Sequence, residues 1–182
     1  MKAIITTERL RLRPLGSGDL EQVHELWTDP GVRRFLFDDQ VISVEQAASE
    51  ITQSNERFKT DGCGLWGATL RDKPELIGFC GYRPFHDPPK LQLLYGFHPD
   101  HWSKGFATEA ARAMIRFGFE QVGLSSILAS ADAPNTASLR VMEKAGMSFD
   151  RRETINGMDT ISYSLDRQHF KPGSAFYDVS PF

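Results

Sequence analysis

The stretch at residues 99–111, PDHWSKGFATEAA, holds the pattern best suited to chemistry, because it can bind an anion. It leads from an expected strand end, through a loop that contains Gly105, into an amphipathic helix. Backbone N–H groups at a helix start lack partners within the helix, and the helix dipole adds partial positive charge there. Gly105 has no Cβ, so a phosphate can come close to the backbone. Two interpretations stay open, an anion site and an ordinary strand–turn–helix connection.

A second glycine pattern, GCGLWG at residues 62–67, matches the GxGxxG fingerprint of dinucleotide-binding proteins, and Asp87 follows at a suitable distance. That fingerprint must follow a strand and open a helix. Here it follows an expected helix and opens an expected strand, so we interpret it as a turn. His86, His98 and His101 match no closed zinc pattern and have no cysteine partner, so we expect no metal.

The composition excludes several classes of protein. The 182 residues are 40% hydrophobic and 25% charged, which is typical of a folded globular chain. A formal net charge of −3, with scattered basic residues, argues against nucleic acid as a partner. No apolar stretch is long enough to cross a bilayer, and the N-terminus does not resemble a signal peptide. Cys63 and Cys80 form no disulfide framework or zinc motif, so we expect a cytoplasmic protein without membrane contact.

Hydrophobic periodicity and turn residues predict the elements that must position the loop. The expected strands cover residues 8–14, 64–71, 75–83, 91–97, 126–131, 147–155 and 158–166. The expected helices follow SGD at residues 17–19, cover 44–59, follow Gly105 and cover 136–145. This order predicts a mixed α/β sheet in a single domain at 1–166. The tail at 167–182 carries aromatic residues that could dock on the domain or on a partner.

Three segments share their order and spacing with one family. ERLRLRPL at 8–15 is similar to an opening strand, WSKGFATEA at 102–110 to a WGxGxATEA phosphate loop, and residues 135–147 to NxxSxxxxEKxGF. With these segments the chain resembles the GNAT acyltransferases that use acetyl-CoA, and within them the RimJ/RimL-like N-acetyltransferases. The resemblance covers residues 8–166. It implies a GNAT-like α/β fold, with a mixed, mostly antiparallel, splayed sheet of six to seven strands and about four helices.

The resemblance also implies a site for acetyl-CoA as co-substrate, with the pyrophosphate on the loop. The residues implied to cradle it through backbone N–H groups are Ser103, Lys104, Gly105, Phe106, Ala107 and Thr108. Lys104 and Arg140 could also meet phosphate charge, or they could be ordinary solvated side chains. Ser103 stands where relatives usually carry glycine, so its Cβ puts the usual backbone path in question.

The splayed strands are implied to hold the pantetheine arm, between the strand that ends near Phe97 and the strand at 126–131. A backbone N–H near Phe97 or His98 is expected to polarise the thioester carbonyl. Asn135 is expected to cap the following helix and, by resemblance, to contact this arm. Ser138, in the first turn of that helix, is the candidate that returns a proton to the leaving thiolate.

The acceptor needs a base, because an alkyl amine is mostly protonated at neutral pH. Glu153 is the candidate base, in an ExxNG context similar to that of RimL-like enzymes; the alternative is an exposed strand-end carboxylate. Gln92 takes a place where relatives often carry an acid, which removes a second possible base. Cys63 and Cys80 lie in no matched motif, so we expect direct transfer in a ternary complex.

The chain is therefore expected to be an acetyl-CoA-dependent N-acetyltransferase that acts on a primary amine, either a peptide N-terminus or a small molecule. A non-catalytic acyl-CoA sensor is the alternative. Residues 17–60 and the loop at 84–90 are expected to build the acceptor pocket. The pair Asp38-Asp39 could attract a cationic acceptor or form an ordinary surface turn. The sequence leaves open whether the protein is a monomer or a homodimer.

Overall fold

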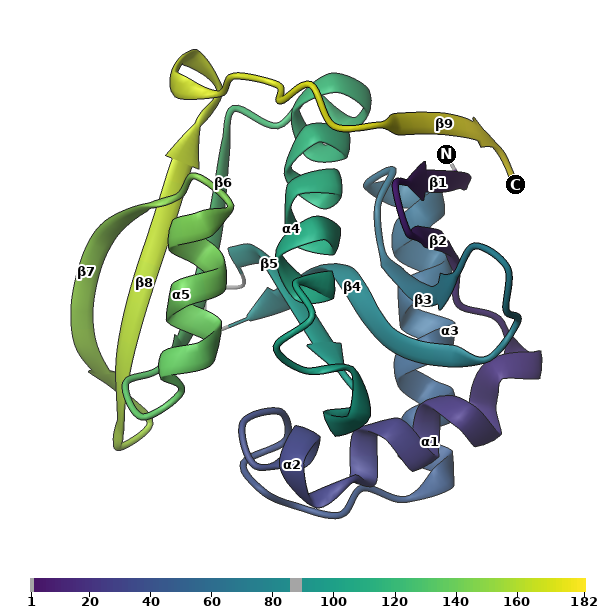
Figure 1. The fold of residues 1–182 in the computed structure, drawn as a ribbon. Coiled ribbons are helices and arrows are strands. Elements are labelled where there is room, and N and C mark those ends of the chain that lie inside the picture. The colour runs from purple at the N-terminus through teal and green to yellow at the C-terminus, as the bar shows by residue number, and fades with distance from the viewer. Residues whose placement is uncertain (1, 86–89) are drawn as a thin grey trace.

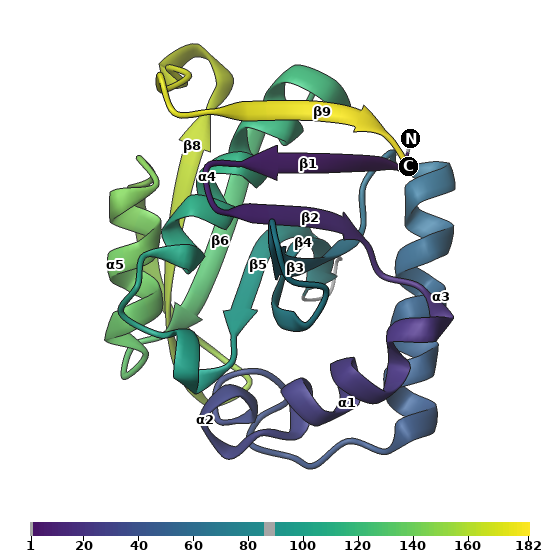
Figure 2. The ribbon, with the colours of Figure 1, turned by 45° about the vertical axis from the view of Figure 1, so that its right-hand side comes forward.

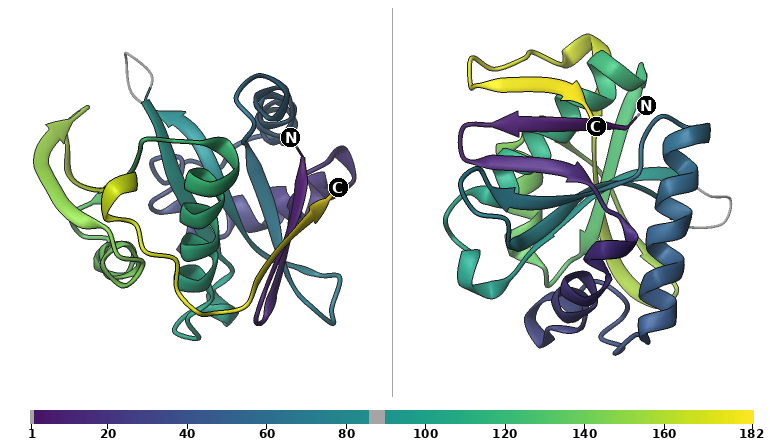
Figure 3. Two further views of the ribbon diagram at one scale, coloured as in Figure 1. Left: turned by 90° about the horizontal axis from the view of Figure 1, so that it is seen from above. Right: turned by 90° about the vertical axis from the view of Figure 1, so that its right-hand side faces the viewer.

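The structure, a computed structural model, describes residues 2–85 and 90–182. These residues form one nine-stranded sheet in the order β7-β8-β6-β5-β4-β3-β2-β1-β9 (Figure 1). Neighbouring strands are antiparallel except β5 and β6, which are parallel. Helices α4 and α5 lie on one side of the sheet and α3 lies on the other (Figure 3).

The N-terminal half opens with a hairpin and continues with helices on one face of the sheet. The hairpin consists of β1 (Ala3–Thr7) and β2 (Leu10–Pro14). The helical elements that follow are the 3-10 turn η1 (Ser17–Asp19), α1 (Leu20–Thr28), α2 (Pro30–Arg33) and α3 (Val44–Thr60). The remaining strands of this half are β3 (Leu65–Leu70), β4 (Leu76–Phe85) and β5 (Lys90–Phe97).

The C-terminal half places two helices on the other face. Its first elements are η2 (Pro99–His101), α4 (Phe106–Phe117), the π-helical turn η3 (Gly118–Val122) and β6 (Ser126–Asp132). Its last elements are α5 (Thr136–Lys144), β7 (Ser148–Ile155), β8 (Met158–Asp166), η4 (Arg167–His169) and β9 (Tyr177–Pro181). Within the described ranges, no helix has the length and apolar content needed to span a membrane.

Several element ends follow local chemistry that is visible in the sequence. The Ser43 hydroxyl accepts the Gln46 backbone N–H at 3.2 Å and starts α3. Gly146, with φ of 92°, ends α5 in the left-handed conformation. Asn156 and Gly157 have φ of 49° and 81°, which is the geometry of a tight hairpin turn between β7 and β8.

The predicted count of six to seven strands and about four helices is too low. The strand predicted at 8–14 is wrong at its start, because Glu8 and Arg9 form a turn and β1 precedes it. The Leu10 backbone N–H donates to the Thr7 hydroxyl at 3.1 Å and closes that turn. The fifth helix is α2. The Asp29 carboxylate caps it by accepting the Gly31 N–H at 2.8 Å, so the residue that ends α1 also starts α2.

The core consists of two clusters on the two sides of the sheet. The larger one lies mainly beneath α4 and α5, and the smaller one mainly beneath α1, α2 and α3. Trp66 on β3 is fully buried, and its indole N–H donates to the Ala3 carbonyl at 2.8 Å. Its ring meets Phe58 and Phe117 edge-on, at centroid distances of 4.6 and 5.0 Å. Trp66 therefore joins α3, α4 and β1 through the sheet.

The tail completes the far edge of the sheet. Strand β9 pairs antiparallel with β1, from Ala3 opposite Pro181 to Thr7 opposite Tyr177 (Figure 2). The segment before β9 crosses the outer face of α4. On the way, the Phe170 ring packs against another aromatic ring, that of Phe119, with centroids 4.9 Å apart. The tail thus docks on the chain's own sheet.

Candidate active site

The sheet opens between β5 and β6. Their parallel ladder has one pair, Gln92 opposite Leu128. Beyond that pair the two strands lean apart toward their carboxyl ends (Figure 1). We call the part of the sheet where β5 and β6 no longer pair, from Phe97 on β5 to Asp132 on β6, the gap. The starts of α4 and α5 follow these two strand ends, so loop and helix N-termini border the gap.

The loop before α4 offers a set of free backbone donors. Gly105, the N-cap, has φ of 81°, and the Glu109 N–H donates to its carbonyl at 3.0 Å. No side chain caps this helix, and no backbone N–H from residues 103–108 has an acceptor in the described part of the chain. Such donors, together with the helix dipole, favour a phosphate. The local geometry therefore suits the pyrophosphate cradle that the sequence predicts.

Ser103 has a left-handed backbone conformation, which favours glycine. Its φ is 60°, in the left-handed region where an L side chain costs about 1–2 kcal/mol. The serine side chain is exposed, so the Cβ meets no buried neighbour. The loop therefore carries local backbone strain at Ser103.

Arg9, which the sequence analysis did not select, braces the loop. Its guanidinium donates to the Lys104 carbonyl at 2.8 Å and to the Glu109 carboxylate at 2.7 Å. It also lies 4.5 Å from the centroid of the Phe106 ring. The Thr7 hydroxyl donates to the same carboxylate at 2.6 Å. The ERLRL and ATEA segments are therefore in contact in the folded chain. Neither motif alone predicts that contact.

The predicted cationic side chains differ in their placement. The Lys104 ammonium donates to the Asp100 carbonyl at 2.8 Å, so in the structure it is held within its own loop. Ala107 and Thr108 form the first turn of α4 behind it. Arg140 is exposed on α5. Among the described residues, neither the Lys104 nor the Arg140 side chain makes a recorded contact with the backbone N–H groups of residues 103–108.

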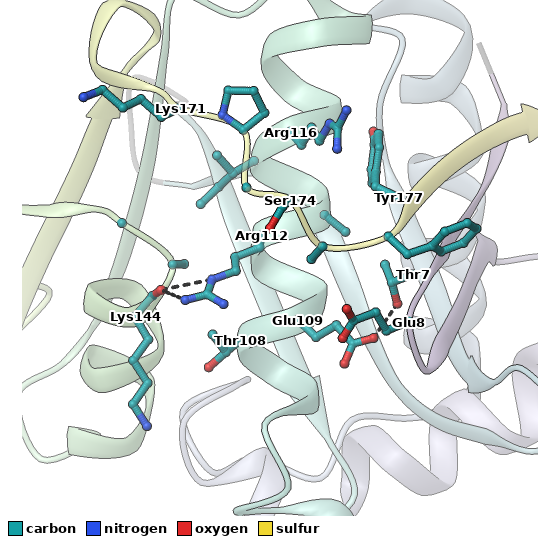
Figure 4. A pocket seen from close by; sticks show the side chains of 18 of the residues that line it. Thr7, Glu8, Thr108, Glu109, Arg112, Arg116, Lys144, Lys171, Ser174 and Tyr177 are labelled. Atoms are coloured by element: carbon teal, nitrogen blue, oxygen red, sulfur yellow. Dashed lines mark hydrogen bonds between the residues drawn. The ribbon is translucent and has the colours of Figure 1, made fainter.

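A cavity of about 830 Å³ adjoins the loop at Gly105 and Thr108 (Figure 4). It lies between α4, the β1–β2 turn, the end of α5 and the tail. Five Arg or Lys residues line it, against the two acidic residues Glu8 and Glu109; the basic residues are Arg9, Arg112, Arg116, Lys144 and Lys171. Arg112 donates to the Lys144 carbonyl at 2.6 Å and retains its charge for a ligand. The cavity is therefore basic and continuous with the loop.

The backbone N–H groups of Phe97 and His98, the two candidates for polarising the thioester carbonyl, point to opposite edges of β5. The His98 N–H donates to the Ile77 carbonyl at 2.9 Å and belongs to the β4 side of β5. Successive peptide groups of a strand point to opposite edges, so the Phe97 N–H points toward the gap. The Trp102 indole holds the Phe97 carbonyl at 2.6 Å. The geometry favours Phe97 over His98 for this role.

Ser138 has a partner that the sequence analysis missed. The Asn135 side chain accepts the Ser138 backbone N–H at 3.2 Å, which confirms the predicted cap of α5. The Tyr95 hydroxyl donates to the Ser138 carbonyl at 3.0 Å and lies 3.1 Å from the Ser138 hydroxyl. Burial raises the pKa of Tyr95 to about 12, so it stays protonated as a donor. Tyr95 sits in an apolar strand without a motif, and only the tertiary fold reveals it.

Glu153 lies at the acceptor side and is not beside Ser138. It sits on β7 opposite Thr160 of β8, which in turn lies opposite Asp132 of β6. Its carboxylate is half-exposed and forms an ion pair with Arg151. To accept a proton, Glu153 must give up part of that ion pair. The structure thus brings together Phe97, Asn135 and Ser138 near the gap and leaves Glu153 two strands away from β6.

Other chemistry finds little support in the described residues. Cys63 and Cys80 are buried, and burial raises the pKa of Cys63 to about 11 and that of Cys80 further still. Such thiols remain protonated and poorly nucleophilic. Across residues 2–85 and 90–182, no cluster of three or more metal-ligating side chains is present. His86 and Asp87, like the rest of the 86–89 loop, lie outside the described residues.

Comparisons with known proteins agree with this geometry. A family model described as an acetyltransferase (GNAT) domain matches residues 9–148. The uncharacterized N-acetyltransferase YnaD of Bacillus subtilis (strain 168) is 32% identical over 149 residues, which cover 82% of this chain and 83% of YnaD. A solved acetyltransferase (GNAT family) of Bacillus anthracis has a TM-score of 0.75 at 26% identity, covering 91% of this chain and 99% of that one.

A further solved structure with a similar fold contains bound coenzyme A. It is RimL, a ribosomal-protein alpha-N-acetyltransferase, in complex with coenzyme A. The likeness has a TM-score of 0.75 at 15% identity and covers 90% of this chain and 97% of RimL. At that identity the likeness shows the fold alone.

Proposed function

Because this chain belongs to the GNAT acetyltransferase family and is an acetyl-CoA-dependent N-acetyltransferase, we propose that it transfers the acetyl group directly to a primary amine within a ternary complex. The acceptor is a small-molecule amine or a peptide N-terminus. A non-catalytic sensor is not supported, since the matched relatives are named acetyltransferases.

The observation that carries the proposal is the uncapped loop beside the gap. Six free N–H donors from Ser103 to Thr108 would hold the two phosphates, and the basic cavity would hold the nucleotide end. Asn135 would hold the pantetheine arm where β5 and β6 part. When bound, acetyl-CoA supplies the thioester whose acetyl carbon the amine attacks. Lys104 and Arg140 would add positive charge at the rim.

Two groups would stabilise the negative charge that develops on the carbonyl oxygen and on the leaving sulfur during transfer. The Phe97 N–H, which points into the gap, would stabilise negative charge on the carbonyl oxygen. The Ser138 hydroxyl would give its proton to the leaving sulfur and take a new proton from solvent. The Tyr95 hydroxyl, 3.1 Å away, would hold the Ser138 side chain in place. Tyr95 acts through Ser138 and is therefore a positioning residue.

Glu153 would receive the proton of the incoming ammonium, directly or through a water chain. Its exposed carboxylate, paired with Arg151, supports this role because solvent and an incoming amine can reach it. Because neither buried cysteine is a nucleophile, no covalent enzyme intermediate is needed.

The finer placement of the chain is part of the same proposal. The loop and the NxxSxxxxEKxGF-like segment support a RimJ/RimL-like subgroup, and residues 1–166 would form the catalytic unit with 167–182 docked on it. Two free, buried cysteines suit the reducing conditions of a cytoplasm.

The experiment follows thiol release from acetyl-CoA over a panel of amines and short peptides. We expect turnover of at least one amine. Ser138→Ala is expected to lower kcat by about tenfold to 100-fold, and Glu153→Gln to shift the pH profile of kcat/KM. If Ser138→Ala leaves the rate unchanged, the acid role is wrong. If Glu153→Gln leaves the rate unchanged at every pH, the base role is wrong.

A further inference from the structure

The Arg9 side chain, from the turn between β1 and β2, surrounds the N-cap of α4 from outside. Its Nη1 donates to the Lys104 carbonyl at 2.8 Å, and its Nε donates to the Glu109 carboxylate at 2.7 Å. The guanidinium carbon lies 4.5 Å from the centroid of the Phe106 ring. These partners stand directly before, directly after and one helical turn after Gly105. The planar guanidinium is therefore fixed against the loop in one orientation.

The bond from Arg9 to the Lys104 carbonyl determines where the next backbone N–H points. In a planar trans peptide, the carbonyl oxygen and the following N–H lie on opposite sides of the C–N bond. The Gly105 N–H therefore points away from Arg9 and from the β1–β2 turn. Gly105 has φ of 81°, and the wide dihedral range of glycine would otherwise let this peptide rotate. Arg9 thus aims an N–H that has no acceptor among the described residues.

Glu109 keeps Arg9 in this position. Its carboxylate accepts the Thr7 hydroxyl at 2.6 Å and the Arg9 backbone N–H at 2.9 Å, and it forms an ion pair with the Arg9 guanidinium at 2.6 Å. The Glu109 side chain is 14% exposed and that of Arg9 is 47% exposed. Because Arg9 is half-exposed, its replacement changes the loop contacts without opening the core.

Resting on the acetyl transfer proposed above, we propose that Arg9 is a positioning residue of the phosphate cradle. By holding the Lys104 carbonyl, Arg9 fixes the Gly105 N–H in the direction of the pyrophosphate of acetyl-CoA. Arg9 acts through the loop and touches neither the thioester nor the amine. The loss of Arg9 therefore weakens the binding of an acetyl donor that carries the pyrophosphate and leaves a donor without phosphate unaffected.

The test compares acetyl-CoA with S-acetylpantetheine, which has the same thioester and no phosphate. The variant is Arg9→Met, which keeps an apolar stem over Phe106 and removes every guanidinium donor. Calorimetry gives the Kd of CoA, and thiol release gives kcat/KM for each donor with the amine that the wild type acetylates best. We expect the Kd of CoA and the KM for acetyl-CoA to rise by about tenfold, the value of one hydrogen bond to a charged group. The kcat/KM for S-acetylpantetheine should stay within about twofold, whereas a merely structural role would impair both donors equally.

The matched control is Arg11→Met, which removes the same charge from an exposed position on β2 and should leave both donors unchanged. Salt separates the direction of the N–H from the charge of Arg9. The loss of CoA affinity in Arg9→Met should persist in about 0.5 M KCl, where the Debye length is about 4 Å. A second variant, Arg9→Lys, keeps the charge beside Glu109 but not the planar fork. It should fold even if Arg9→Met does not, and it should bind CoA at least about threefold more weakly than the wild type.

The outcomes separate this inference from the proposed function. If Arg9→Met binds CoA as the wild type does, or loses both donors equally, the positioning role is wrong and acetyl transfer stands. If the loss disappears in high salt, or if Arg9→Lys binds CoA as tightly as the wild type, Arg9 acts by charge alone and the positioning role is also wrong. If no amine or peptide releases thiol while CoA still binds, the proposed function itself fails, and the Kd values of CoA still decide the role of Arg9.

Discussion

The α4–α5 face and the α1–α2 face present opposite charge to the same gap. On the first, free backbone N–H groups lead into a cavity lined by Arg112, Lys144 and Lys171. On the second, Asp132 ends β6, and burial together with the negative charge of Asp38 raises its pKa. In the proposed function, the phosphate-bearing co-substrate would approach from the first face and the amine from the second.

The two faces also differ in the atoms they use. In the loop at 103–108, the groups available to an anion are backbone N–H groups, so we expect changes of the loop side chains to alter recognition little. Ser103 illustrates this, because it keeps a glycine conformation. The acceptor side relies on side chains such as Asp132 and Gln92. Substitutions there can change the acceptor while the fold and the phosphate cradle persist.

The largest effect is expected from Gly105→Ala. A methyl group at φ of 81° disfavours the turn that aims the donors, and the new Cβ lies 3.4 Å from the Arg9 guanidinium. We expect the KM for acetyl-CoA to rise by about tenfold or more, the acceptor KM to stay unchanged, and unfolding to become about 1 kcal/mol easier.

Gly123→Ala is the control for this change, since Gly123 has φ of 83° at the end of η3 and open space around it. It should lose similar stability and keep its KM for acetyl-CoA, as measured by steady-state kinetics and chemical denaturation. An equal rise of KM in both variants would show that the loop has no special role.

A smaller effect on the anion side is expected from Arg112→Ala and Lys144→Ala. Each removes an exposed charge from the cavity, where such contacts contribute about 0.2–1 kcal/mol. The KM for acetyl-CoA should rise roughly two- to fivefold, and its dependence on salt should weaken. Lys59→Ala, on α3, is the control. A matching change in acceptor KM would contradict the separation of the two faces.

Asp132→Asn is expected to stabilise the protein slightly. The folded pKa of Asp132 is raised, so its charged form is disfavoured in the folded state and costs stability at neutral pH. The variant should gain about 1–2 °C in Tm at pH 7. The gain should disappear as the pH falls through the raised pKa to below the ordinary carboxyl value. A loss of Tm at pH 7 would mean that Asp132 is structural.

The smallest effect is expected from Ser103→Gly. Glycine relieves the left-handed strain at φ of 60° but adds freedom to the unfolded chain. The two contributions nearly cancel, so the free energy of unfolding should change by less than about 1 kcal/mol. Acetyl-CoA kinetics should match the wild type. A large gain in affinity would show that the serine obstructs the cradle.

Sequence patterns predicted the elements that local rules determine. Ser43, Asn135 and the Asn156-Gly157 turn lie where their side chains or dihedral preferences require. The missed strand β1 has the pattern AIITT, which carries little alternation, and the neighbouring Leu–Arg alternation concealed the turn. Strand β9 depends on pairing with β1, which lies at the other end of the chain.

The candidate site divides in the same way. The phosphate loop was readable because its donors belong to one continuous segment. Tyr95 and Arg9 were not, because each acts on a residue about 40 or more positions away. The pKa of Asp132 depends on Asp38, and its position depends on the register of β6 with β8. Such contacts arise from tertiary folding and leave no local spacing to find.

The tail segment that leads into β9 forms one wall of the basic cavity. The tail that lines the cavity is anchored before it by Phe170 against Phe119. Beyond it, the anchors are the five pairs with β1 and Tyr177 beneath the Arg116 guanidinium, 4.3 Å from the ring centroid. An edge strand can detach at a free energy far below that of global unfolding. A ligand that fills the cavity and contacts the tail must therefore slow amide hydrogen exchange in β9, at the far edge of the sheet. The rate of amide hydrogen exchange in β9 would therefore indicate whether the cavity is occupied.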